Sequence, residues 1–428
     1  MSKTPYMKRV SDGILALELQ AAGAVLIEGP KWCGKSRTAG EMAKSAVMMQ
    51  DPDMAASYMK AAKTMPSLLL RGETPHLVDE WQVAPVIWDA VRAEVDRRGG
   101  MGHFILTGSA TPPDGNDDEE VKRRHTGTGR ITRMRMRPMS LWESGESNGE
   151  VSLGALFSGN CDVGAVSRVT VPDISRLICR GGWPESVGLP ERLSFRVASN
   201  YVKAVVEEDI HRVDGVERNP ARVMALLRSL SRNISTLATI ETISGDMLAN
   251  DAGASGKTVS AYVNAMRRLF LVEDTPAWMP TLRSKTAIRA SAKRQFADPS
   301  IATAAMGIGP ERLLSDFNTF GFLFESLCTR DLRVYAQSMD GTVAHYRDKN
   351  GLEADLIVSL PDGRWAPVEV KLGEGEVDEA AAHLHKLAST VDPVKTGVPS
   401  FMMVLTGTPL AYRRPDGVIV CPIGCLCP

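Results

Sequence analysis

The residues with the clearest chemistry form a glycine-rich segment near the amino end of the chain. Residues 29–36 read Gly-Pro-Lys-Trp-Cys-Gly-Lys-Ser, which has the spacing G-x-x-x-x-G-K-S. An apolar run, residues 23–27, precedes this segment and a helix-prone stretch follows it, and that context separates a phosphate-binding loop from a chance match. Backbone N–H groups of the loop can face phosphate oxygens, Lys35 can reach the β- and γ-phosphates, and the Ser36 hydroxyl can bind Mg²⁺. We therefore expect this segment to bind ATP with Mg²⁺ and to take part in ATP hydrolysis.

Two carboxylates follow a later apolar run and complete a candidate hydrolytic site. Asp79 would hold Mg²⁺ through water, and Glu80 would orient and deprotonate the attacking water. A third apolar run ends in Thr107 and Ser109, either of which can hydrogen-bond the γ-phosphate or the water, although a polar strand end that only caps the next loop fits equally well. The residues expected to contact the nucleotide are Gly29, Pro30, Lys31, Trp32, Cys33, Gly34, Lys35, Ser36, Arg37 and Ser109.

Basic residues are concentrated between Val121 and Ser140, where Asp and Glu are absent. Alternation along a strand would place Arg133, Arg135 and Arg137 on one face. One arginine of this stretch can serve as an arginine finger that stabilises the transition state, and the others can meet phosphates. A solvated strand face that balances nearby acidic residues is the other interpretation. The basic residues are Lys122, Arg123, Arg124, Arg130, Arg133, Arg135 and Arg137.

Several short motifs occur in a fixed order along the chain, and in combination they resemble those of a prokaryotic family of AAA-type ATPases. Members of that family carry a C-terminal domain of unknown function. The resemblance covers nearly the whole chain and implies that Arg130 is the arginine finger. Trp81 stands at a hydrophobic position of the motif around Asp79 and Glu80, which leaves the catalytic residues in place. The matching segments are 76–82, 104–109, 129–130, 137–143, 181–185, 208–210, 283–285 and 296–299.

A second set of charged residues lies near the carboxyl end. Glu369 and Lys371 are two residues apart and would share one strand face, and Asp355 precedes them across a Pro-Asp-Gly turn. This set looks like the Asp…Glu-x-Lys core of the restriction-endonuclease-like fold. The resemblance implies that Asp355 and Glu369 hold Mg²⁺, that Lys371 activates water for attack on a phosphodiester, and that Glu325 adds a ligand from a helix. A solvated hairpin, and a retained fold without nuclease activity, stay open; Glu353 would share a face with Asp355, so the ligand set is open too.

The apolar pattern predicts three consecutive domains of the α/β class. Residues 1–218 alternate strands with helices, as expected for a P-loop AAA-type ATPase with a helical lid; residues 219–300 have a winged-helix-like outline, although a plain helical subdomain fits as well; residues 301–428 would form the restriction-endonuclease-like α/β domain. The expected strands are 24–28, 76–79, 103–107, 131–136, 343–347, 354–360, 365–370, 401–405 and 418–420, and the expected helices are 35–48, 53–64, 84–97, 221–232, 240–250, 320–336 and 377–387.

Composition narrows the class of protein and of partner. The 428 residues are 43% hydrophobic and 24% charged, as in an ordinary globular protein, and a net charge of −1 restricts any nucleic-acid surface to a local patch. The longest apolar runs are shorter than the ~20 residues of a membrane helix, and the first ten residues lack a signal-peptide core, so we expect a cytoplasmic protein. The basic residues of one candidate DNA-binding patch are Arg283, Lys285, Arg289, Lys293 and Arg294.

Two functions fit the sequence. In the first, ATP binding and hydrolysis drive an action on DNA through the winged helix and the nuclease-like domain. In the second, ATP controls a regulatory switch whose C-terminal domain binds a protein partner without cleaving DNA. Self-association of identical chains is open in both.

Overall fold

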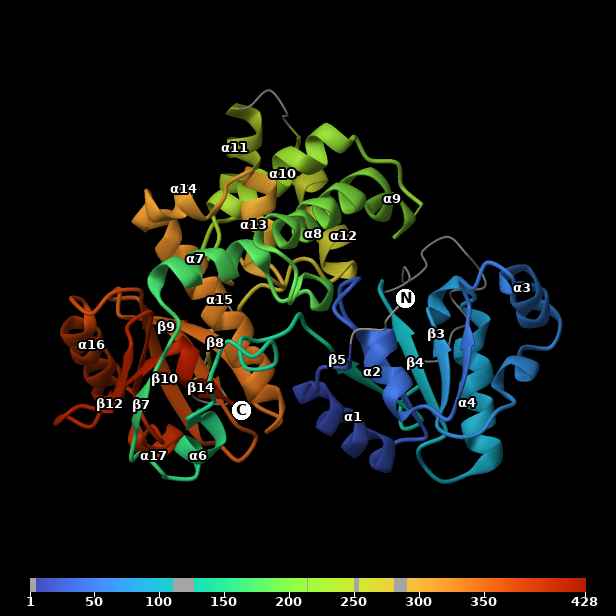
Figure 1. Ribbon diagram of the computed structural model, residues 1–428, viewed down its shortest axis with the longest axis horizontal. Helices are drawn as coiled ribbons and strands as arrows, with labels where there is room; N and C mark the ends of the chain where they lie inside the picture. Colours follow the sequence, from blue (N-terminus) through green and yellow to red (C-terminus); the bar gives the residue numbers. More distant parts are fainter. Residues whose placement is uncertain (1–4, 111–126, 214, 250–253, 281–290) are drawn as a thin grey trace. The chain divides into compact units, whose positions relative to one another are not determined.

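Two compact units make up the protein in the computed structural model, which describes residues 5–110, 127–213, 215–249, 254–280 and 291–428 (Figure 1). One unit contains Met1–Arg137, Glu208–Glu217 and Asn264–Leu271, and the other contains Pro138–Glu207, Arg218–Val263 and Val272–Pro428. These units do not follow three consecutive segments, so the expected three-domain division stays a prediction. Among the described residues, no helix has the length and apolar character needed to cross a membrane.

A parallel sheet of five strands, with the order β2-β3-β4-β1-β5, lies at the centre of the first unit, and four of these strands were predicted. Strand β4 lies between β1 and β3, so the strand that leads into the glycine-rich loop and the strand that ends in the two carboxylates are separated by one neighbour. The carboxyl ends of all five strands meet at one edge because every pair is parallel. The strands are β1 (Ala24–Glu28), β2 (Ser45–Met48), β3 (His76–Asp79), β4 (Phe104–Gly108) and β5 (Ile131–Arg135).

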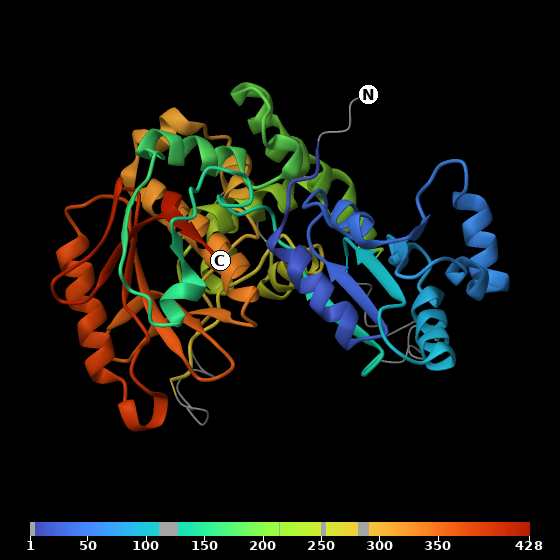
Figure 2. The same ribbon diagram turned by 60° about the horizontal axis from the view of Figure 1, so that its bottom comes forward.

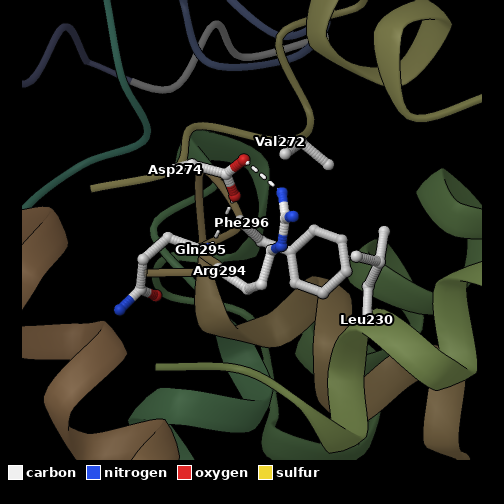
Figure 3. Close-up of a pocket in the computed structure, with 6 residues that line it drawn as sticks. All are labelled: Leu230, Val272, Asp274, Arg294, Gln295 and Phe296. Atoms are coloured by element: carbon white, nitrogen blue, oxygen red, sulfur yellow. Dashed lines mark hydrogen bonds and ion pairs between the residues drawn. The ribbon is translucent and has the colours of Figure 1, made fainter. Parts of the chain in front are cut away.

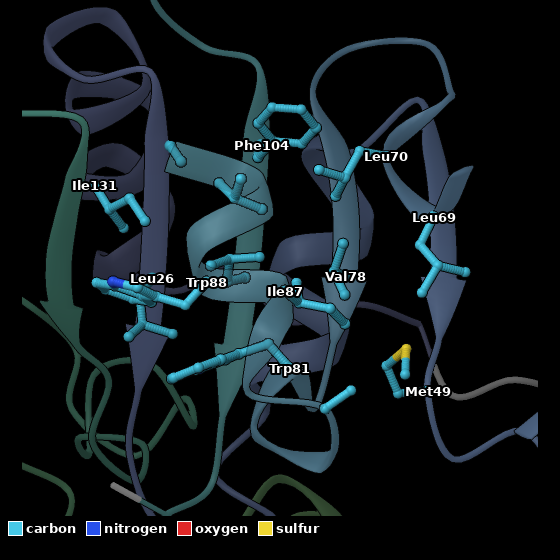
Figure 4. Packing of buried hydrophobic residues seen from close by; sticks show 14 of the residues in the cluster. Leu26, Met49, Leu69, Leu70, Val78, Trp81, Ile87, Trp88, Phe104 and Ile131 are labelled. Atoms are coloured by element: carbon cyan, nitrogen blue, oxygen red, sulfur yellow. The ribbon is translucent and has the colours of Figure 1, made fainter. Parts of the chain in front are cut away.

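Helices cover both faces of this sheet because buried side chains alternate along its strands. Leu26 belongs to a cluster with Trp88 of α4, which Figure 4 shows, whereas Val25 and Ile27 belong to a second cluster with Leu15 of α1. The helices of this unit are α1 (Val10–Ala21), α2 (Lys35–Met42), α3 (Ala55–Thr64), the 3-10 helices η1 (Pro66–Leu70) and η2 (Trp81–Val83), α4 (Val86–Arg98) and α9 (Ile210–Arg212).

The expected helix over 35–48 is wrong in its second half. Helix α2 ends at Met42, and residues Ser45–Met48 form the edge strand β2, paired in parallel with β3. The alanine and methionine residues here favour a helix locally, but hydrogen bonding to β3 outweighs that weak preference.

A bundle of helices forms one part of the second unit. In it α7, α8, α10 and α13 pack on one another. After α12 the chain runs through two antiparallel bridges, Val272 to Phe296 and Thr275 to Lys293. The helices of the second unit that precede residue 317 are α6 (Leu153–Phe157), α7 (Val171–Arg180), η3 (Pro184–Ser186), α8 (Glu191–Ala204), α10 (Pro220–Arg232), α11 (Ile240–Ala249), α13 (Pro299–Met306) and α14 (Pro310–Leu314). Two further helices, η4 (Val205–Asp209) and α12 (Gly256–Arg268), begin in the second unit and end in the first.

A mixed sheet of seven strands, ordered β7-β12-β13-β11-β10-β9-β8, forms the other part. The predicted Asn-Gly and Asp-Gly turns join β8, β9 and β10, with φ of 82° at Gly351 and 91° at Gly363. The short strands β7 and β12 were not predicted. Figures 1 and 2 show α15 and α16 on opposite faces of the sheet. The elements are β6 (Val151–Ser152), β7 (Gly164–Val166), α15 (Phe317–Gln337), β8 (Thr342–Arg347), β9 (Glu353–Ser359), β10 (Trp365–Lys371), α16 (Val377–Thr390), α17 (Pro393–Thr396), β11 (Met403–Thr406), β12 (Leu410–Arg413), β13 (Ile419–Pro422), η6 (Ile423–Cys425) and β14 (Leu426–Cys427).

Candidate functional site

The glycine-rich loop turns tightly between β1 and α2. A Cβ atom at Gly29 would lie 2.1 Å from the carbonyl oxygen of Met136, so only glycine fits there. Gly34 caps the amino end of α2 with a φ of 105°, which again favours glycine. Lys35 is 4% exposed, and its Nζ donates to the carbonyl oxygens of Gly29 (3.0 Å) and Pro30 (2.8 Å). The loop therefore holds its lysine against its own backbone, at the amino end of a helix, where phosphates bind.

Arg9 contacts this loop from outside it, a contact that was not predicted. Its guanidinium group is buried and donates from Nη1 to the carbonyl oxygen of Cys33 and from Nη2 to that of Arg137, both at 2.8 Å. One side chain thus ties the loop to the chain just beyond β5.

Lys31, the other lysine of the loop, forms an ion pair with Asp209. Its Nζ lies 2.5 Å from Oδ1 of Asp209, whose side chain is only 8% exposed. Asp209 lies in segment 208–210, one of the segments that resemble the ATPase family, but that segment did not predict a contact with Lys31. The charge of Lys31 is therefore compensated within the same unit.

Thr107 links the two carboxylate residues at the end of β3. Its hydroxyl donates to Oδ1 of Asp79 at 2.6 Å and accepts from the backbone N–H of Glu80 at 3.0 Å. Glu80 has a φ of 55°, an uncommon conformation for a residue with a side chain, and this N–H contact helps to hold it. Thr107 thus contacts both carboxylate residues, and its role as a sensor of the γ-phosphate or the water stays a prediction.

The Glu80 carboxylate is itself held by two polar side chains. Its Oε2 accepts a hydrogen bond from the Ser109 hydroxyl at 2.8 Å and another from Nε2 of Gln82. Gln82 also donates to the Ser109 hydroxyl at 3.3 Å. The predicted nucleotide contact Ser109 therefore touches the candidate base directly, and Gln82 is a further site residue that the sequence reading left without a role.

Two oxygen-bearing side chains at this edge, those of Ser36 and Asp79, are the predicted Mg²⁺ ligands. Ser36 is the second residue of α2, which follows β1, and Asp79 ends β3, which lies two strands from β1 and so about 10 Å across the sheet. Hydroxyl and carboxylate oxygens are the hard ligands that Mg²⁺ prefers, and it usually completes its shell with water and nucleotide phosphates.

Arg130 lies at the opposite end of the sheet from the loop. Its carbonyl oxygen accepts from the N–H of Ala24 at the start of β1, whereas the loop follows the end of β1. Its Nε pairs with Asp96 at 2.8 Å. Within its own chain Arg130 is therefore not brought to the nucleotide site, and a finger role would need a neighbouring chain.

Two other arginines of this basic stretch make contacts within the unit. Arg133 pairs with Glu28 at 2.9 Å and lies over the ring of Trp88, and Arg135 lies 4.2 Å over the ring of Phe270. For Arg133 and Arg135, these contacts favour a strand face that is balanced within the unit over a surface that binds phosphates. Lys122, Arg123 and Arg124 lie outside the described residues.

The charged residues predicted near the carboxyl end do come together, but around a lysine that was not assigned to them. Nζ of Lys293 lies 2.8 Å from Oε1 of Glu325 and 3.4 Å from Oδ1 of Asp355. Nζ of Lys371 lies 3.5 Å from Oε2 of Glu369. We call these five residues the C-terminal cluster.

Burial and mutual contacts set the protonation of this cluster. Burial raises the pKa of Glu325 to about 8, although Lys293 acts in the opposite direction. Burial, together with the neighbouring Asp355 carboxylate, raises the pKa of Glu369. Burial alone would raise the pKa of Asp355 as well, but Lys293 and Lys371 together hold it below its usual value. Negative charge is thus concentrated on Asp355, beside the Lys293 ammonium.

The predicted Mg²⁺ ligands Asp355 and Glu369 do not fit a metal site. Within the described ranges, no group of three or more His, Cys, Asp or Glu side chains is arranged to hold a metal ion. The ammonium group of Lys293 takes the space between Glu325 and Asp355. Glu353, the alternative ligand, instead pairs with Arg347 at 3.0 Å on the exposed side of the hairpin.

The basic patch expected around residues 283–294 is also wrong for its two described members. Lys293 is buried in the cluster, and Arg294 donates from Nη1 to Asp274 at 2.9 Å with its side chain 11% exposed. Figure 3 shows this ion pair among the residues that line a shallow indentation, together with Leu230, Val272, Gln295 and Phe296. Arg283, Lys285 and Arg289 lie outside the described residues.

Three family profiles match separate parts of the chain. Residues 21–144 match an AAA domain, residues 171–312 a domain of unknown function (DUF8612), and residues 320–426 another domain of unknown function (DUF4143). No curated protein matches the sequence. Among solved structures, the Walker-type ATPase of Pyrococcus abyssi is similar at 13% identity with a TM-score of 0.43, over 70% of this chain and 96% of that one. The chain carries an AAA domain, a class of P-loop ATPase domain, followed by two domains of unknown function.

Proposed function

We propose that this protein hydrolyses ATP at the carboxyl edge of its parallel sheet and couples hydrolysis to an action on DNA. The observation that carries the first part is the order of three adjacent strands: β1 leads into the loop with Lys35, β3 ends at Asp79, and β4 lies between them. Lys35 holds the transferring phosphate, and Glu80 takes the proton of the attacking water. Mg²⁺, held by Ser36 and Asp79, would neutralise charge on the phosphates.

The middle of the chain supports DNA as the target. We infer a winged helix here from the order of helices α10, α11 and α12, followed by two antiparallel bridges that join residues 272 and 275 to residues 296 and 293. Helix α12 contains no acidic residue and ends in Arg267 and Arg268. In helix-turn-helix folds such a helix enters the major groove, where basic side chains meet phosphates.

Phosphate release by the full chain, measured with and without single-stranded, duplex and branched DNA, tests both parts. We expect ATP turnover that requires Mg²⁺, is lost in Lys35→Ala, and rises with at least one form of DNA. Absence of turnover in the parental chain would remove the ATPase assignment. Turnover that no DNA changes, without DNA binding, would remove DNA as the target.

A regulatory switch is the second candidate, and one observation favours it over DNA cleavage. Lys293 stands among the carboxylates where a nuclease would hold its metal. In this function ATP sets the conformation and the C-terminal domain binds a protein partner. ATP-dependent binding of a protein, combined with no response to DNA, would favour the switch.

A further inference from the structure

The C-terminal cluster contains a built-in positive charge at its centre. We infer that the ammonium group of Lys293 is the resident cation of this cluster, in the place where a divalent metal would bind, so that the native C-terminal domain takes up no metal ion there. Lys293 is 6% exposed and its Nζ lies between Glu325, at 2.8 Å, and Asp355, at 3.4 Å. Mg²⁺ needs oxygen ligands at about 2.0–2.1 Å in an octahedral shell. An ammonium group in that position excludes such a shell by its volume and repels a second cation.

The backbone around Lys293 fixes the lysine in this position. The N–H and C=O of Lys293 both pair with Thr275, each at 2.9 Å. Arg333 of α15 donates to the Thr275 hydroxyl at 2.8 Å, which ties this pairing to the helix that carries Glu325. The next residue, Arg294, is fixed by Asp274. The backbone that carries Lys293 is therefore held by hydrogen bonds on both its N–H and its C=O group.

The carboxylate oxygens of the cluster are also committed to contacts within the fold. Oδ2 of Asp355 accepts the N–H of Val370 at 2.9 Å, and Oε2 of Glu369 lies 3.5 Å from Nζ of Lys371. Three carboxyl groups face two ammonium groups, Lys293 and Lys371. The most negative net charge that the cluster can carry is therefore −1, when every group is ionised. Removing Lys293 makes the most negative net charge of the cluster −2 and frees the space between Glu325 and Asp355.

Binding of Mn²⁺ to the nucleotide-free full chain, followed by electron paramagnetic resonance, tests this inference. We expect Lys293→Met to bind one Mn²⁺ at least about tenfold more tightly than the parental chain, because the site gains charge and space. Adding Asp355→Asn should remove the gain. Lys371→Met is the matched control, because it removes the same charge but leaves Lys293 in place, and it should gain no such binding. Mn²⁺ should also raise the melting temperature of Lys293→Met. The effect of Mn²⁺ on the melting temperature of the parental chain should be the same with and without Asp355→Asn.

Three results would overturn the inference. The first is Mn²⁺ binding by the parental chain that Asp355→Asn abolishes, and this measurement needs no Lys293 variant to fold. The second is a folded Lys293→Met chain that gains no binding. The third is an equal gain in Lys371→Met, since charge alone would then explain the effect.

Discussion

Two lysines of the glycine-rich loop, four residues apart, have different surroundings and should contribute differently to ATP turnover. Lys35 is buried at the start of α2 and donates to loop carbonyl oxygens, so its ammonium group is placed beside the expected phosphates. Lys31 is compensated by Asp209. The spacing of the motif predicts that Lys35 is the phosphate ligand. Because Lys31 is already paired with Asp209, substitution of Lys31 is a matched control for substitution of Lys35.

Replacing Lys35 by alanine should lower ATP turnover by about 100-fold or more, because the substitution removes a charged donor that stabilises the transferring phosphate. Lys31→Ala should change turnover by only a few-fold. Phosphate release by both variants and the parental chain checks the difference. Equal losses in the two variants would mean that Lys35 has no special place in the site.

His345 should make stability depend on pH. Burial lowers its pKa from 6.5 to about 4, and Nε2 lies 3.0 Å from the carbonyl oxygen of Ser291. Below pH 6.5 the unfolded chain binds a proton that the folded chain does not, so the free energy of unfolding should fall as pH drops from 6.5 towards 4, by about 1.4 kcal/mol per pH unit from this group. His345→Gln should remove that part of the slope in melting experiments, whereas the exposed His383→Gln should keep it. An unchanged slope in His345→Gln would contradict the assignment.

The candidate site was predictable where its residues lie next to one another in sequence. Asp79 and Glu80, and the loop with Lys35, could be read from local motifs because each motif is contiguous. Arg9 and Lys293 could not, since their partners Arg137 and Asp355 lie 128 and 62 residues away. No local pattern distinguishes a buried arginine or lysine of this kind from a solvated one.

At the scale of elements, strands with a strong apolar signal were predictable and short edge strands were not. The buried strands β1, β3 and β4 lie within a residue of their predicted bounds, because their side chains are apolar on both faces. Strand β2 has a half-exposed pattern and helix-forming residues, and only its pairing with β3 makes it a strand. Strands β7 and β12 are short and depend likewise on partners distant in sequence.

Helix α12 carries the prediction for DNA binding. Lys257→Gln, an exposed position near its start, should weaken binding to all sequences alike and reduce the salt slope by about one phosphate contact. Lys386→Gln removes an exposed lysine from α16 and should leave both quantities unchanged. Titrations at several salt concentrations measure the slopes. Identical slopes in the parental chain and Lys257→Gln would exclude this helix as a phosphate-binding surface.

At the scale of the whole molecule, the two candidate sites belong to separate compact units. The loop, Asp79 and Glu80 lie in the first unit, and the C-terminal cluster lies in the second. The sequence predicts three consecutive domains. In the structure, Glu208–Glu217 and Asn264–Leu271 belong to the first unit although they lie far along the chain. Neither composition nor periodicity indicates that a later segment packs with an earlier unit.

Lys371→Ala should therefore leave basal ATP turnover within about twofold of the parental rate, because its contacts lie entirely within the second unit. Parallel assays of phosphate release measure this. A large loss of turnover in a folded variant would show that the two sites are coupled in a way that separate units do not explain.

Glu80→Gln provides the most direct test of the central claim, that ATP is hydrolysed at the edge of the parallel sheet. The substitution keeps the size of the side chain but removes the base, so the variant should bind ATP as the parental chain does and release phosphate at least about 100-fold more slowly. Nucleotide binding and single-turnover phosphate release, measured on the same preparation with Mg²⁺, give both quantities. Phosphate release at the parental rate by Glu80→Gln would contradict the account.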